Sequence, residues 1–330
     1  MNPALPSGLE SALARLAEGA GSLRSAAEFL HARYSRGGDS RYAGADSARA
    51  YAVTRMPATT AAVLACLRGI APHLAGCRSQ LDLGSGTGAA LWAARAMIPG
   101  LARAIAVERD PAPIACAEQL WDLEPGHYRP EWRHAAIPGS PVTGAPAERP
   151  LPAADLVSAA YAFSELPESD LTAAVRVAWA ATGRVLLLVE PGTPAGFAAI
   201  LAARSQVLAH GAEILAPCPH AGACPMAGAA QWCHRAVRLP RSAQARAWKG
   251  GRLGFEDEKF CYLAVARAPA ELPAARLIAT PRVHKAAVEL RLCAPGGLME
   301  AIIPRRDQRY RAAKDLAWGD AWPAGWPAPR

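Results

Sequence analysis

The pattern of apolar and polar positions divides the chain into a helical first part, a long alternation of strands and helices, and a short β-rich last part. Apolar residues recur at helical spacing over 8–34 and over about 45–70, and Pro57 marks a kink or a boundary in the second run. From position 79 onward, short apolar runs alternate with helical stretches. This alternation predicts a doubly wound α/β fold, in which helices cover both faces of a parallel sheet.

Five short apolar runs between positions 79 and 190 are the predicted parallel strands. The last of them, 184–190, is continuously apolar between its charged ends, as in a strand buried on both faces. The alternating residues 260–266 predict a further strand of the same sheet. Farther on, the runs 286–293 and 298–303 flank a Pro-Gly-Gly turn and predict an antiparallel hairpin.

These elements indicate four regions. We expect a helical N-terminal region at 1–76 and a Rossmann-like domain at 77–212 that is completed by the strand 260–267. A cysteine-rich loop with a basic segment occupies 213–259, and a β hairpin with a basic tail occupies 268–330.

Composition and charge narrow the class of protein. The chain has 330 residues, of which 52% are hydrophobic and 19% charged, which is globular rather than disordered composition. The formal net charge of +8 favours a polyanionic partner. No secretory signal or apolar run of about 18 residues is present, so we expect no membrane span and, for a bacterial protein, a cytoplasmic location. We also expect the free protein to be a monomer.

A glycine-rich turn follows the first predicted strand and leads into a helix. Glycines allow the backbone to approach a ligand closely, and the helix N-terminus supplies N–H donors. The next strand ends in an acid that can accept hydrogen bonds from ribose hydroxyls. The pattern resembles the S-adenosylmethionine (SAM) site of class I methyltransferases. It predicts these cofactor-binding residues: Asp82, Gly84, Ser85, Gly86, Gly88 and Glu108.

The end of the fourth strand lacks the usual methyltransferase chemistry. Amino-group methyltransferases often carry Asn/Asp-Pro-Pro-aromatic there, whereas this chain has Ser-Ala-Ala-Tyr at 158–161. It also lacks a Pro-Cys nucleophile at that place. No catalytic residue is therefore assigned, and Tyr161, Ser164 and Glu165 are expected to have structural roles.

Three cysteines, Cys218, Cys224 and Cys233, lie within sixteen residues of a proline-rich loop. Such a loop buries little apolar surface. The clustering of these three among the eight cysteines of the chain indicates metal ligands in a reducing compartment rather than disulfides. Spacing allows zinc or an iron–sulfur cluster, with His220 or His234 as a possible substitute for one thiolate. The fourth ligand must come from elsewhere, and Cys293 lies at a strand end where its thiolate can project. Cys261, inside an alternating strand, is expected to be a core residue.

Basic residues follow the cysteine loop without an acid among them, and they predict a contact with an RNA phosphate backbone. A solvated surface is the alternative reading, and the acids at 256–258 are expected either to pair with these arginines or to fix the loop by hydrogen bonds. A second basic segment covers 305–314. The predicted RNA-binding residues are Arg235, Arg238, Arg241, Arg246, Lys249 and Arg252.

The motifs at 189–194, 216–220, 232–234, 249–251 and 255–260 resemble the methyltransferase-like family of mitochondrial small-ribosomal-subunit proteins and their bacterial relatives. The resemblance implies a class I methyltransferase fold that binds small-subunit rRNA during ribosome assembly, in the bacterial cytoplasm or the mitochondrial matrix. It also implies a [4Fe–4S] cluster on Cys218, Cys224, Cys233 and Cys293. Two alternatives are an active SAM-dependent rRNA methyltransferase and a small-molecule methyltransferase with a structural zinc ion.

Overall fold

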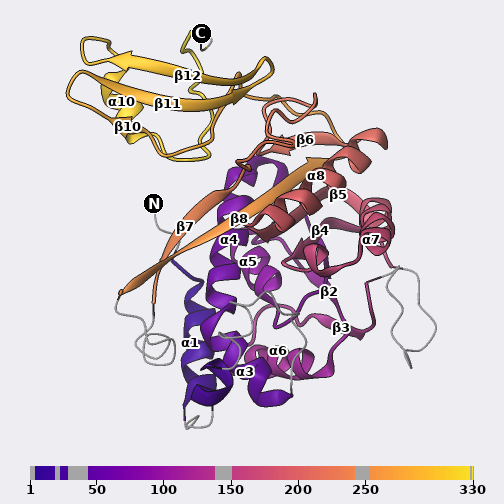
Figure 1. The fold of residues 1–330 in the computed structure, drawn as a ribbon. Coiled ribbons are helices and arrows are strands. Elements are labelled where there is room, and N and C mark those ends of the chain that lie inside the picture. The colour runs from indigo at the N-terminus through magenta and orange to yellow at the C-terminus, as the bar shows by residue number, and fades with distance from the viewer. Residues whose placement is uncertain are drawn as a thin grey trace.

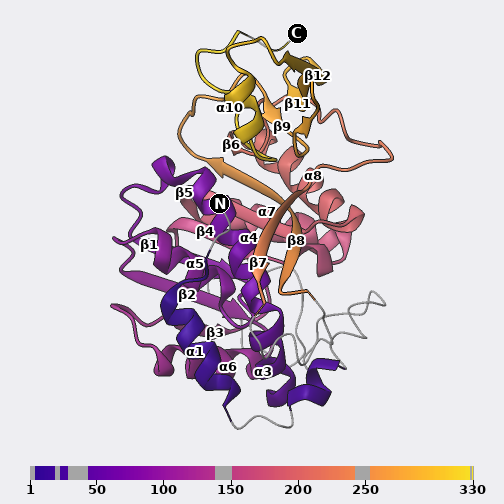
Figure 2. The ribbon, with the colours of Figure 1, turned by 90° about the vertical axis from the view of Figure 1, so that its left-hand side faces the viewer.

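The computed structural model describes residues 4–18, 23–28, 44–137, 151–241, 253–327 and 329. Within them, an eight-stranded sheet lies between two layers of helices and forms the main body (Figure 1). A smaller four-stranded sheet builds a separate C-terminal module, residues 275–327. Figures 1 and 2 both place this module at one end of the main body, beyond β6 and α8.

The strand order of the main sheet is β3-β2-β1-β4-β5-β8-β6, and β7 pairs with β8. Strands β1 to β5 are parallel, whereas β8 runs antiparallel to β5 and β6. This order confirms the predicted class I methyltransferase fold, with a late antiparallel strand inserted beside β5. The strands are β1 Ser79–Leu83, β2 Arg103–Glu108, β3 Glu131–His134, β4 Ala154–Ala160, β5 Thr182–Pro191, β6 Glu213–Ala216, β7 Arg235–Pro240 and β8 Phe255–Ala266.

Helices cover both faces of this sheet because successive strand residues point to opposite sides. In β5, Leu187 and Val189 pack with one helical layer, whereas Leu186 and Leu188 pack with the other. The first layer holds α1 Ser7–Ala17, α3 Ala45–Thr54, α4 Met56–Gly69, α5 Ala89–Met97 and α6 Pro111–Leu123, and the second holds α7 Glu168–Ala181 and α8 Pro194–Ala209. Two short 3₁₀ turns, η1 Ala71–Leu74 and η2 Phe163–Glu165, follow α4 and β4.

The predicted break near Pro57 is confirmed, since α3 and α4 meet at Arg55 with a bend of 50°. Pro57 lies in the first turn of α4, where its missing N–H leaves no helical hydrogen bond unmade. No single described helix has the length and apolar character to cross a bilayer. The bent pair of α3 and α4 meets those two criteria only when taken together.

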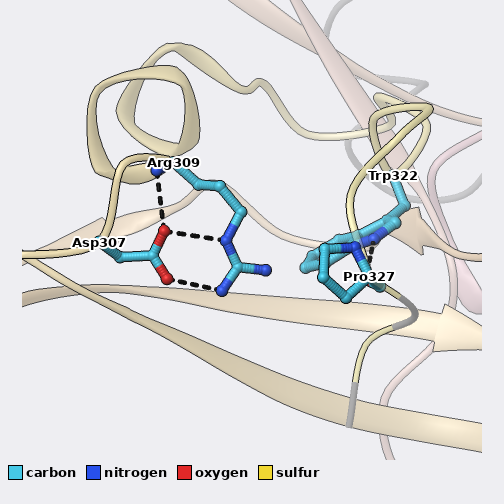
Figure 3. Close-up of polar contacts among 4 residues, drawn as sticks. All are labelled: Asp307, Arg309, Trp322 and Pro327. Atoms are coloured by element: carbon cyan, nitrogen blue, oxygen red, sulfur yellow. Dashed lines mark hydrogen bonds and ion pairs between the residues drawn. The ribbon is translucent and has the colours of Figure 1, made fainter.

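The C-terminal module has its own core, which includes Leu290, Leu292 and Trp322. The predicted hairpin is confirmed as β11 and β12. Just after it, the Asp307 carboxylate accepts hydrogen bonds from the backbone N–H and from the guanidinium of Arg309 (Figure 3). The elements are β9 Arg276–Leu277, β10 Arg282–Val283, β11 Ala287–Ala294, β12 Gly297–Pro304 and α10 Tyr310–Asp315.

Candidate functional site

A cavity of about 410 Å³ opens at the carboxyl ends of β1, β2 and β4, where ligands bind in doubly wound folds. Five of the six residues predicted to bind the cofactor line this cavity. The exception is Gly88, which caps α5 in the left-handed conformation with φ of 89°. The lining residues from the prediction are Asp82, Gly84, Ser85, Gly86 and Glu108.

Asp82 braces the glycine-rich turn from below. Its carboxylate is buried and accepts hydrogen bonds from the hydroxyls of Ser85 and Ser158, both at 2.6 Å. Burial raises the pKa of Asp82 to about 6, and the two hydroxyl bonds oppose this shift. Asp82 therefore links the glycine-rich turn to strand β4 through these two hydrogen bonds, and the links fix the shape of the cavity.

Glu108 joins the two loops that follow β1 and β2. One of its carboxylate oxygens accepts from the backbone N–H of Gly86 at 2.8 Å, and the other accepts from that of Asp110 at 2.9 Å. Burial raises the pKa of Glu108 above its ordinary value. Each oxygen retains a lone pair for a further donor, such as a ribose hydroxyl.

The cavity also holds a polar group without a partner. The hydroxyl of Thr87 is buried and makes no hydrogen bond to any described residue. Together with Glu108 and the turn with its positive φ values at Gly84 and Gly86, this orphaned hydroxyl fits a polar ligand of the SAM type.

The turn after β4 is held by a residue that sequence reasoning missed. Glu190, at the end of β5, is fully buried and accepts from the backbone N–H groups of Phe163 at 2.8 Å and Ser164 at 3.1 Å. Burial raises the pKa of Glu190 to about 7. The signal in the sequence was an acid that ends an otherwise apolar strand.

Replacing Glu190 with glutamine should change how stability depends on pH. The pKa of Glu190 is near 7 in the folded protein, above its ordinary value of 4.5, so the folded state binds this proton more tightly than the unfolded state does. The contribution of Glu190 to the free energy of unfolding is therefore present at low pH and is lost as pH rises from about 4.5 to about 7. Wild type should thus gain at most about 3 kcal/mol relative to Glu190→Gln between pH 8 and pH 5. Urea unfolding at both pH values measures the difference. Glu213→Gln, on the exposed end of β6, controls for the loss of one surface carboxylate. A pH-independent difference for Glu190→Gln would contradict the assignment.

Tyr161 adopts a left-handed conformation with φ of 57°, which is uncommon for a residue other than glycine. Its hydroxyl donates to the Glu258 carboxylate of β8 at 2.6 Å. Tyr161, Ser164 and Glu165 all line the cavity, and so does Arg55. The tyrosine therefore lines the cavity and is hydrogen-bonded to β8.

A second, smaller cavity of about 50 Å³ brings the predicted metal ligands together. Cys218, Cys224 and Cys233 line it from the loop, and Cys293 lines it from β11 of the C-terminal module. Cys293 Sγ lies 3.6 Å from Nε2 of His220. Burial raises the pKa of Cys218 and of Cys233, and that of Cys293 to about 11. Buried thiols of this kind need a cation before they ionise.

These thiols share one cavity but do not yet form a coordination sphere. Among the described residues, no three His, Cys, Asp or Glu side chains are close enough together to hold a metal ion. The donors are nevertheless of one chemical kind, since sulfur ligands select zinc or iron–sulfur clusters. The set fits such a centre in composition, and the thiols would have to draw closer on binding.

Arg204 of α8 holds the cysteine loop in place. It is buried, and its guanidinium donates to the carbonyl oxygens of His220 and Gly222, each at 2.8 Å. Cys261 is buried as predicted, and its thiol donates to the Cys233 carbonyl at 3.1 Å. Neither contact was visible in the sequence, because both join segments that are distant in the chain.

The predicted basic segment is only partly described, since Arg246, Lys249 and Arg252 lie outside the described residues. Arg235 and Arg238 belong to strand β7. Arg235 donates to the carbonyl of Trp318 and has a largely covered side chain.

Two acids of β8 pair with arginines of the basic segment, which was one of the two arrangements expected for the acids at 256–258. Arg238 makes two 2.7 Å bonds to Asp257, and Arg241 pairs with Glu256 at 3.1 Å. A phosphate group would compete with these carboxylates.

Comparison with known proteins places these features in context. The family model described as "Mitochondrial small ribosomal subunit Rsm22" matches residues 45–323. The human protein named "Ribosome assembly protein METTL17, mitochondrial" is 32% identical over 264 residues, which cover 74% of this chain and 55% of that protein. The chain therefore spans just over half the length of this relative.

Solved structures show more distant similarity. The SAM-bound magnesium protoporphyrin IX methyltransferase from Synechocystis has a TM-score of 0.41 at 15% identity, covering 81% of this chain and all of that one. A TehB-like SAM-dependent methyltransferase from Corynebacterium glutamicum has a TM-score of 0.37 at 13% identity, covering 75% and 98%. The fold assignment above rests on strand order rather than on these likenesses.

Proposed function

Because the chain belongs to the Rsm22 family of mitochondrial small ribosomal subunit proteins, we propose that it binds small-subunit rRNA during ribosome assembly. The match over 45–323 carries this proposal, and the name of the human relative as a ribosome assembly protein supports it. The net charge of +8 suits an RNA partner. The protein would act where ribosomes are built, in the bacterial cytoplasm or the mitochondrial matrix.

The cavity beside the glycine-rich turn is proposed to hold SAM. Glu108 would accept hydrogen bonds from the ribose, and the turn at Gly84–Gly86 would allow close approach of the ligand to the backbone. When bound, SAM supplies a sulfonium-activated methyl group. Asp82 and Glu190 hold the loops on either side of the cavity through the hydrogen bonds described above.

The four cysteines are proposed to hold a [4Fe–4S] cluster, with zinc as the alternative metal. Support comes from their common cavity and from their all-sulfur donor set. Three of the thiols belong to the loop and the fourth to the C-terminal module. A metal centre there would cross-link the module to the main body and fix its orientation.

Binding of RNA without methyl transfer is the favoured activity, because Tyr161 occupies the place of the usual target-gripping motif and is bound to Glu258. The second candidate is an active rRNA methyltransferase, which the braced cavity and its partnerless Thr87 hydroxyl favour. Mass spectrometry of rRNA from a deletion strain separates the two. Loss of one methylated small-subunit nucleotide would establish the enzyme.

Ultraviolet crosslinking in cells tests the proposed function directly. Sequencing of RNA recovered with the purified protein should show small-subunit rRNA enriched over large-subunit rRNA and messenger RNA. A matched sample of unirradiated cells controls for RNA that associates after lysis. Recovery of the two rRNA species in their cellular ratio would refute the proposal.

A further inference from the structure

We propose that a basic surface at one end of the C-terminal module is the principal RNA-contacting surface of this protein. This inference rests on the proposed function and locates the RNA partner on the molecule. We call the surface the C-terminal basic patch, and it consists of Lys285, Arg305, Arg306, Arg311 and Lys314.

Three separate segments meet at this patch. The hairpin pairing brings Ala287 opposite Pro304, and the backbone N–H of Arg305 donates to the Ala286 carbonyl at 2.7 Å. Helix α10 joins them, because the Tyr310 hydroxyl donates to the His284 carbonyl at 3.3 Å. Figure 1 shows α10 against the small sheet, beside β10.

Helix α10 adds two of the charges to the same end. The ammonium of Lys314 lies 5.8 Å from the Tyr310 ring centre. Arg311 and Lys314 are three residues apart and therefore neighbours on the helix surface. The tyrosine thus connects the helical cations to the turn that carries Lys285.

All five cations are exposed, and none of them makes an ion pair with a described residue. Of the acids in these segments, Asp307 is already bound by Arg309 through contacts of 2.9 and 2.6 Å. Asp315 is the other acid there. Five cations stand against Asp315, which lies one helical turn after Arg311, so the patch keeps a surplus of positive charge.

The arginines of β7 differ from the patch in this respect. Arg238 and Arg241 pair with Asp257 and Glu256, so their positive charge is already partly offset and a nearby phosphate is also repelled by the carboxylate. A cation without such a partner attracts a phosphate more strongly. The free cations therefore dominate the attraction to a phosphate backbone.

Two exposed apolar side chains precede patch residues in the chain, but they lie on opposite faces of the small sheet. Val283 of β10 is 50% exposed, lies two residues before Lys285 and shares the face of the buried Val288 and Ile303. Ile302 of β12 is 61% exposed, lies three residues before Arg305 and shares the other face with Glu289. Cations beside apolar side chains suit RNA, which offers phosphates together with sugar and base surfaces. The cations are held on strand ends and a six-residue helix rather than on a long amphipathic helix, which favours RNA over a membrane surface.

The test compares two double variants that remove equal charge. Full-length wild type, Arg305→Ala with Arg306→Ala, and Arg238→Ala with Arg241→Ala are titrated with small-subunit rRNA transcript between 50 and 200 mM KCl. The patch variant should bind about tenfold more weakly, and its slope of log K against log salt should fall by about 1.5, as expected for two lost phosphate contacts. The β7 variant should stay within about twofold of wild type.

A second patch variant, Lys285→Ala with Lys314→Ala, should weaken binding to a similar extent, and thermal unfolding verifies that both patch variants are folded. If wild type binds no RNA, the proposed function fails and the patch fails with it. If wild type binds and both folded patch variants bind equally well, the patch is overturned while the proposed function stands. Binding of wild type to phosphatidylserine vesicles in preference to the transcript would overturn both.

Discussion

Replacing Cys218 with serine should abolish metal binding at the proposed four-cysteine centre and lower the thermal unfolding midpoint by about 10 °C or more. A closed metal site contributes its binding free energy directly to folding, and one missing thiolate of four opens the site. The loop has few other anchors, chief among them the buried Arg204 and its two carbonyl partners. Iron and zinc analysis, visible absorption and calorimetry of anaerobically purified protein measure the result.

Cys261→Ala is the matched control for this experiment. Its thiol lines the same cavity but is committed to the Cys233 carbonyl, and it is not among the four proposed ligands. The control should retain full metal content and lose only about 1 kcal/mol of stability for the missing hydrogen bond. Unchanged metal content and midpoint in Cys218→Ser would contradict the four-cysteine centre.

Cys293→Ser extends this test to the C-terminal module. If the centre joins the module to the main body, the variant should lose metal and should also expose the segment between β8 and β9 to limited proteolysis. The contacts that would remain between the described parts of module and body include the Arg235 bond to Trp318 and the Arg291 bond to Gln231. Proteolysis unchanged from wild type would show that these contacts hold the module without a metal.

Replacing Glu108 with glutamine should weaken SAM binding by about 10- to 100-fold. Both carboxylate oxygens already accept backbone N–H groups, from Gly86 and Asp110. In glutamine, an NH₂ group replaces one of the two accepting oxygens. The backbone N–H of Gly86 or Asp110 then faces another donor, and a ribose hydroxyl loses one acceptor. Each unmade buried hydrogen bond costs about 1–3 kcal/mol, which matches the expected loss of affinity. Isothermal titration calorimetry with SAM measures it.

Glu131→Gln is the corresponding control, because this exposed carboxylate on β3 pairs only with Arg133 in the described structure and lies outside the cavity. It should bind SAM as wild type does. Wild-type affinity in Glu108→Gln, or no detectable binding in wild type, would show that this cavity does not recognise SAM through its ribose.

The two cavities are joined through neighbouring strands. Trp232, in the cysteine loop, donates to the carbonyl of Gly192 at 3.0 Å, just beyond β5. On β8, Glu258 holds Tyr161 at the first cavity, while Cys261, three residues on, contacts the carbonyl of Cys233.

The chain order of apolar runs was enough to predict the doubly wound sheet and the glycine-rich turn with its acid at Glu108. It also predicted the C-terminal hairpin and the three-cysteine loop. These features depend on side-chain periodicity and on short-range backbone geometry, both of which are written locally in the sequence. The burial of Cys261 followed from the alternation of its strand in the same way.

Only the tertiary structure decided which of these groups meet and which charges remain uncompensated. Sequence order placed Arg238 in a run free of acids, whereas the pairing of β7 with β8 sets Asp257 beside it. Glu190 and Arg204 act on loops that are 16 to 27 residues away in the chain. Strand pairing and burial bring distant residues together, and no local pattern records these contacts, so the bracing of both cavities and the free charge of the C-terminal basic patch emerged from the fold.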